Sequence, residues 1–282
     1  MDENKNFIET LGAQFSDPDV RDYRIAKSSL KTEFPAEFEL TMPPVHNQDS
    51  VSSCVAHSIS LVAEYYNKEQ HDIDEPLSAG YIYGNRNALL GHGQGMITRL
   101  AISNFCADGT PYKIDFPDHY EVPEIIDAVK ARKEELADKA EQFRFTAYLK
   151  TGSKEEIKTA LMAGTPVIIA VDWQKDMCYR NGEFYSTYLY GKSGGHAMVI
   201  YGWNERGWKV QNSWGVEWGN KGTAVWPYYY RLRETYAIID EATTLLTINK
   251  PYATKSKFAK FFIRGINKLY AFFYNLKHKT SK

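Results

Sequence analysis

Hydrophobic residues in the first half of the chain are spaced as in helices. After Ser50, apolar residues recur at three- and four-residue intervals, which predicts an amphipathic helix. These residues are Val55, Ile59, Val62 and Tyr66. Serines stand before them and are suited to capping the start of the helix. Three further helices are predicted, from Ser78 to about Leu90, as a short helix after the glycine-rich segment 91–95, and over the charged residues 124–142.

The second half consists of short β-branched and aromatic runs separated by Gly, Asn and Asp, a pattern typical of strands. The runs cover residues 143–150, 165–173, 182–190, 196–203, 208–215 and 223–230. Between the first two, SKEEIKTALMAG predicts a capped helix that ends at Gly164. Because helices dominate the first half and strands the second, we expect an α+β protein with two lobes and a cleft between them.

The charge of the chain is divided between two unlike parts. Nine of its 34 basic residues and none of its 35 acidic residues lie in 250–282, so this tail carries +9 and residues 1–249 carry −10. In the tail, basic and aromatic residues repeat on opposite faces of a predicted helix. We expect the tail either to dock on the acidic body or to lie on an anionic membrane surface. The acidic body gives no support for nucleic-acid binding.

Cysteine content and hydropathy suggest a location in the cell. Three cysteines in 282 residues do not make a disulfide framework and favour a reducing compartment. The N-terminal residues lack the apolar core of a secretory signal, and no run of 18 apolar residues predicts a membrane-spanning helix. We therefore expect a cytoplasmic protein, associated peripherally with a membrane if the tail binds lipid.

Four polar residues are candidates for catalysis. Cys54 is predicted at the first turn of a helix, where the helix dipole favours a thiolate. His196, behind two glycines, is suited to taking and returning the thiol proton. Asn212 follows 16 residues later and can accept a hydrogen bond from the imidazole. The amide of Gln48, six residues before Cys54, can join the Cys54 backbone N–H in an oxyanion hole.

The segments that hold these residues resemble the three active-site blocks of papain-like cysteine proteases. The segments are HNQDSVSSCVAHS, GGHAMVIYGW and QNSWGVEWGNKG. His196 and Asn212 follow Cys54 by 142 and 158 residues, against ~130–150 in that family. The resemblance extends to about Ile239 and implies a papain-like fold, with a helical lobe around the Cys54 helix and a β-barrel-like second lobe.

The resemblance also implies roles for individual residues. Cys54 would be the nucleophile, His196 the general acid and base, Asn212 the residue that orients His196, and Gln48 the oxyanion donor. Four further residues would bind substrate or cover the site: Gly95, Met96, Gly195 and Trp214. The reaction implied is hydrolysis of peptide bonds through a thioester, with a peptide or protein as substrate. It needs no cofactor, and the histidines lack the spacing of a metal site.

The family pattern divides the chain into three parts: an arm over residues 1–35, a peptidase domain over 36–249 and the tail over 250–282. We expect residues 16–35 over or near the cleft, where they would restrain activity. Val51 and His92 replace a pair of bridging cysteines, which agrees with a reducing compartment. Two alternatives remain open, namely a transpeptidase or amidase that uses the same thioester chemistry, and a latent papain-fold binding module.

Overall fold

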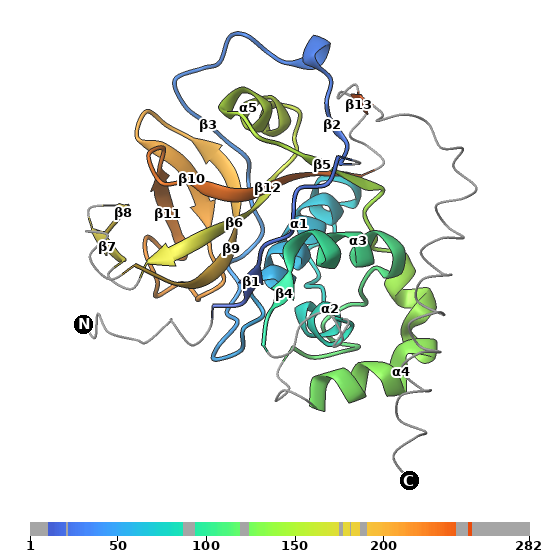
Figure 1. Cartoon of the computed structure of the whole chain (residues 1–282). Helices are drawn as coiled ribbons and strands as arrows, with labels where there is room; N and C mark the ends of the chain where they lie inside the picture. Colours follow the sequence, from blue (N-terminus) through green and yellow to red (C-terminus); the bar gives the residue numbers. More distant parts are fainter. Residues whose placement is uncertain are drawn as a thin grey trace. The chain divides into compact units, whose positions relative to one another are not determined.

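The computed structural model describes residues 11–20, 22–86, 94–118, 124–174, 177–180, 182–186, 191–240 and 248–249 (Figure 1). The chain separates into two units, Met1–Ile248 and Asn249–Lys282. The predicted tail helix and His92 lie outside the described residues. Within the described residues, no helix is both long and apolar enough to cross a membrane.

The helices of the first half gather around α1. They are α1 (Cys54–His71), α2 (Ala79–Gly84), α3 (Thr98–Asp108) and α4 (Glu124–Glu141). Helix α1 packs against α2 and α3, and α2 packs against α4. Every residue of α1 from Cys54 to Asn67 is buried, so this helix is the core of its lobe rather than a helix with one wet face. The second predicted helix ends earlier than expected, at Gly84.

Nine of the described strands form one mixed sheet. They are β3 (Phe38–Glu39), β5 (Ala147–Lys150), β6 (Val167–Gln174), β7 (Cys178–Arg180), β8 (Glu183–Tyr185), β9 (Lys192–Trp203), β10 (Gly207–Gln211), β11 (Thr223–Pro227) and β12 (Leu232–Ile239). Their order is β5-β12-β6-β9-β10-β11-β8-β7, and β3 also pairs with β9. Helix α5 (Lys154–Met162) packs on β6 and β9. The helical lobe and the sheet lobe confirm the predicted α+β class (Figure 1).

Helix α5 begins and ends as its sequence predicts. The Ser153 hydroxyl accepts the backbone N–H of Glu156, and the Glu156 carboxylate accepts the Ser153 N–H in return, which completes a capping box. The helix ends just before Gly164, whose φ of +77° is favourable for glycine.

Strand β12 lies between the edge strand β5 and β6, although the hydrophobic pattern does not predict it. Its first half is polar because those side chains meet other segments. Arg233 pairs with Asp172 at 3.1 Å, and a carboxylate oxygen of Glu234 accepts the backbone N–H of Ser16 at 2.8 Å. Its second half, up to Ile239, pairs with both β5 and β6 and is buried.

The N-terminal arm forms short pairings with both lobes. Its strand β1 (Ala13–Gln14) pairs in parallel with β4 (Met96–Ile97) of the helical lobe and contacts β9 of the sheet. Figure 1 shows β1 between these two elements. Strand β2 (Arg24–Ile25) then contacts β5, and a 3-10 turn follows over Lys27–Ser29. The last described strand is β13 (Ile248–Asn249).

The buried position of β6 leads to a test of the fold. Ile168, the second residue of β6, lies between β12 and β9 and is 0% exposed, whereas Ile114 is 88% exposed. Ile168→Ala should reduce the free energy of unfolding by about 2–5 kcal/mol, because it removes buried methyl groups and leaves a cavity. Ile114→Ala should change it by less than about 0.5 kcal/mol. Urea denaturation followed by fluorescence measures both, and equal destabilisation would place Ile168 outside the core.

Candidate active site

Cys54 is the first residue of α1 and is completely buried. Its thiol lies against the backbone of Ala197, the residue after His196, and of Gly12 in the arm. Burial raises the pKa of the thiol to about 11, although hydrogen bonds with these backbone groups act in the opposite direction. The thiolate expected from the helix N-terminus is therefore disfavoured in this conformation, because loss of hydration outweighs the helix dipole.

His196 lies within β9, and its ring is held by Asn212. The imidazole Nε2 is 2.8 Å from the side-chain carbonyl oxygen Oδ1 of Asn212. Because that oxygen only accepts, the proton of a neutral ring is on Nε2. The other nitrogen, Nδ1, is buried without a hydrogen-bond partner among the described residues. Burial lowers the pKa of His196 to about 4, against the opposing effect of the Asn212 bond, so the ring is neutral near pH 7.

Two tryptophans cover the His196 ring. Trp214 stacks on it with ring centroids 4.3 Å apart, and Trp173 meets it edge-on at 5.3 Å. The two indoles also contact each other at 4.9 Å. The sequence blocks identify Trp214 as a covering residue but not Trp173. In the sequence, Trp173 is marked by its place at the end of a predicted strand. The structure pairs that strand with the strand of His196.

Gln48 is fixed by a residue that the sequence did not single out. The hydroxyl of Ser213 donates to Gln48 Oε1 at 2.6 Å, and the backbone N–H of Gln48 donates to the carbonyl of Ser213 at 2.8 Å. With its oxygen held there, the amide NH₂ points toward the start of α1 and donates to Val51 O at 2.8 Å. Ser213 stands between Asn212 and Trp214, so its place in that block is the signal that could have identified it.

The arm lies on the residues that the sequence predicts to bind substrate. The backbone N–H of Met96 donates to Gly12 O at 2.8 Å. The backbone approach is so close that a Cβ atom at Gly95 would overlap Gly12 O, and a Cβ atom at Gly195 would overlap Ala13 O. Residues 12 and 13 therefore make these contacts. Among residues 16–35, hydrogen bonds and an ion pair lead to Glu234, Arg99, Lys150, Thr159 and Trp203.

Metal ligands are not assembled in the part of the chain that the structure describes. Within it, no three His, Cys, Asp or Glu side chains are placed to hold a metal ion. The chemistry available at the site is that of a thiol, an imidazole and amide hydrogen-bond donors, which is suited to acyl transfer.

Comparisons with known proteins agree with this geometry. A family model described as papain family cysteine protease matches residues 35–242. An uncharacterized peptidase C1-like protein of Acanthamoeba polyphaga mimivirus is 26% identical over 216 residues, which are 70% of each chain. A cathepsin L-like proteinase of Fasciola hepatica is 36% identical over 77 residues, 26% of this chain and 24% of that protein. The chain thus aligns with about a quarter of the length of the latter relative.

Solved structures show the same fold at low sequence identity. Xylellain, a cysteine protease from Xylella fastidiosa, is 20% identical with a TM-score of 0.68, covering 82% of this chain and 96% of its own. A procathepsin B from Trypanosoma congolense is 18% identical with a TM-score of 0.66, covering 84% and 89%. Both similarities support the two-lobed architecture.

The burial of Cys54 predicts slow alkylation. In the full chain near pH 7, iodoacetamide should label Cys54 more slowly than Cys178, which is partly exposed, because the Cys54 thiol is neutral and out of solvent. Mass spectrometry of tryptic peptides at timed intervals measures both rates. Faster labelling of Cys54 than of Cys178 would mean that the arm does not cover the thiol in solution.

Proposed function

This chain belongs to the papain family of cysteine proteases, and we propose on that basis that it hydrolyses peptide bonds in peptide or protein substrates. The observation that carries the proposal is the bond between His196 and Asn212. It places the ring proton on Nε2 and leaves Nδ1 as a proton acceptor on the strand whose next residue, Ala197, touches the Cys54 thiol.

In the proposed reaction, the Cys54 thiol transfers its proton to His196 Nδ1, and the thiolate attacks the peptide carbonyl carbon. The carbonyl oxygen gains the negative charge and is stabilised by the Cys54 backbone N–H and the amide of Gln48. As the C–N bond breaks, His196 returns the proton to the leaving amine. Water then attacks the thioester, which releases the carboxylic acid and restores the Cys54 thiol.

We further propose that the conformation described is a latent one. The arm covers Cys54 at Gly12 and occupies the backbone positions of Gly95 and Gly195 that would bind substrate. When the arm leaves, water can reach both reacting groups, so the pKa of Cys54 falls from about 11 and that of His196 rises from about 4. The thiolate–imidazolium pair then becomes accessible near neutral pH.

The reducing compartment and the latent binding module, both expected from the sequence, remain proposals. A reducing compartment is supported by the three cysteines, all of which are free. The latent binding module is favoured by the burial of Cys54, but it would not need the intact pairing of His196 with Asn212. Peptidase assays of variants at Cys54 and Gly12 distinguish an enzyme from a binding module.

Loss of the nucleophile tests the proposed chemistry. Cys54→Ala should reduce kcat/KM for fluorogenic peptides at least ~10⁴-fold, the order found when a nucleophile is removed. Cys106→Ala is the matched control and should retain activity within about twofold, since its side chain lies on α3, outside the proposed machinery. Retained hydrolysis in Cys54→Ala would refute the peptidase proposal.

A single substitution in the arm tests latency. A side chain at Gly12 would overlap the backbone of Ser52, and overpacking of this kind costs typically ~1–3 kcal/mol. Gly12→Val should therefore shift the arm toward release and raise kcat/KM about tenfold. Val20→Ala, at a position 95% exposed in the same arm, should leave it unchanged. An unchanged rate in Gly12→Val with weakened arm contacts, measured by limited proteolysis of the arm, would argue against latency.

A further inference from the structure

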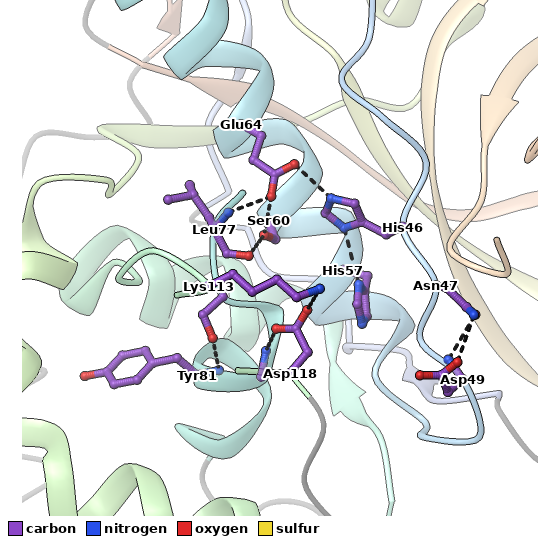
Figure 2. Close-up of polar contacts among 12 residues, drawn as sticks. His46, Asn47, Asp49, His57, Ser60, Glu64, Leu77, Tyr81, Lys113 and Asp118 are labelled. Atoms are coloured by element: carbon purple, nitrogen blue, oxygen red, sulfur yellow. Dashed lines mark hydrogen bonds and ion pairs between the residues drawn. The ribbon is translucent and has the colours of Figure 1, made fainter. Parts of the chain in front are cut away.

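A chain of polar side chains links α1 to the segment that precedes it, and the proposed reaction does not use it. His46 Nε2 lies 2.8 Å from a carboxylate oxygen of Glu64, and His46 Nδ1 lies 3.3 Å from Nδ1 of His57 (Figure 2). His57 and Glu64 both belong to α1 and are 4% and 6% exposed. His46 is partly buried, with 15% of its side chain exposed. Burial of titratable side chains such as His57 and Glu64 requires a specific set of partners.

The Glu64 carboxylate is held in place by other groups of the lobe. Its other oxygen, Oε1, accepts the backbone N–H of Leu77 at 2.8 Å and the hydroxyl of Ser60 at 3.3 Å. When the Glu64 carboxylate is ionised it only accepts hydrogen bonds, and His46 then donates its Nε2–H to Glu64. The His46 side chain is therefore attached to α1 at two points, Glu64 and His57.

The backbone of the same segment is attached to the other half of the site. The carbonyl of His46 accepts the N–H of Gly215 at 2.9 Å, Asn47 forms a β-bridge with Trp214, and the N–H of Gln48 donates to Ser213 O at 2.8 Å. Residues 46–48 therefore connect the helix that begins at Cys54 with the segment that carries Asn212.

We propose that His46 is a positioning residue, which holds Gln48 in register with Cys54 while His46 and His57 share no more than one positive charge. The inference rests on the proposed function, in which Gln48 stabilises the oxyanion. It assigns to the Glu64–His46–His57 chain a role in catalysis through Gln48, without contact with substrate.

The limit of one charge follows from counting protons. When both rings are neutral, His46 keeps its proton on Nε2 for Glu64, and His57 donates its Nδ1–H to Nδ1 of His46. When His46 is a cation, its Nδ1–H donates to a neutral His57 instead. When both rings are cations, two N–H groups face each other across 3.3 Å, and the bond is replaced by repulsion.

Carboxylates on two segments lie near the two histidine rings. Glu64 faces His46 from α1. Asp118, which binds Lys113 Nζ at 2.7 Å and the Gly80 N–H at 2.7 Å, feels the charge of His57. Burial alone would raise the pKa of Asp118, but His57 and these two partners together lower it. Lys113 pairs with Asp118 and therefore offsets part of the negative charge near His57.

A double-mutant cycle tests the proposal. The full-length chain is assayed in whichever background, wild type or Gly12→Val, has the higher activity. Gln48→Ala should lower kcat for amide hydrolysis ~10²–10³-fold, as the loss of an oxyanion donor does. His57→Phe should lower kcat about tenfold with KM within twofold, because the oxyanion forms only in the transition state. If His57 acts through Gln48, the double variant should be no slower than Gln48→Ala.

Two readouts separate positioning from a general loss of structure. Alkylation of Cys54 by iodoacetamide forms no oxyanion, so its rate should stay within twofold in His57→Phe. His57→Asn keeps an amide that can bond to His46 Nδ1 but takes no charge. At pH 7 the kcat of His57→Asn should stay within threefold of the parent value. Below pH ~6, where histidines gain protons, kcat should fall less steeply with pH in His57→Asn than in the parent. His71→Gln, at the exposed end of α1, is the control for both and should match the parent.

The outcomes distinguish the inference from the proposed function. If the parent hydrolyses no peptide, the proposed function fails and the inference fails with it. If the parent is active but the losses from Gln48→Ala and His57→Phe multiply, His57 does not act through Gln48 and only the inference fails. Equal losses of hydrolysis and of alkylation in His57→Phe would also overturn it, because they would show damage to Cys54 itself.

Discussion

The contact between the start of α1 and the middle of β9 is the constraint on which the rest of the structure depends. Cys54 belongs to the helical lobe and His196 to the sheet, so neither lobe contains the site alone. The two elements are among the most extensively packed pairs that join the lobes. A shift of about 1 Å between reacting groups can cost two orders of magnitude in rate, so this junction must be rigid.

Rigidity at the junction comes from segments that are bonded to both lobes. Residues 46–48 join α1 through the His46 side chain and join the Asn212–Gly215 segment through backbone hydrogen bonds. The arm joins β4 to β9 in a similar way through β1. The two differ in their relation to the Cys54 thiol, because the backbone of Gly12 lies against it whereas residues 46–48 bond to α1 through Glu64 and His57. One therefore supports the site and the other covers it.

Burial has opposite consequences for the hydrogen-bonded groups around Glu64 and for the reacting pair Cys54 and His196. Around Glu64, each buried polar group has partners in its own lobe, so the charge can be kept out of water. Cys54 is buried against the arm and His196 under Trp214 and Trp173, and desolvation drives both toward their neutral forms. Burial thus strengthens the hydrogen bonds around Glu64, whereas it keeps Cys54 and His196 in their neutral, unreactive forms.

The sequence determined much of this protein by itself. Helical spacing predicted α1, the S-K-E-E pattern predicted the start of α5, and three short blocks placed Gln48, Cys54, His196 and Asn212 as candidates. These features could be predicted because each depends on residues that are close along the chain. Strand β12 could not be predicted in this way, since its polar first half is matched by Asp172 and Ser16, which are distant in sequence.

Tertiary structure decided the remaining properties of the site. Only the fold placed Gly12 against Cys54 and Ala13 against Gly195, and brought Ser213 to Gln48. Only the fold joined His46 to His57 and Glu64, residues that resemble isolated polar positions in the sequence. The physical reason is that the protonation of a side chain depends on its hydration and its partners, and both are set by segments that meet only after folding.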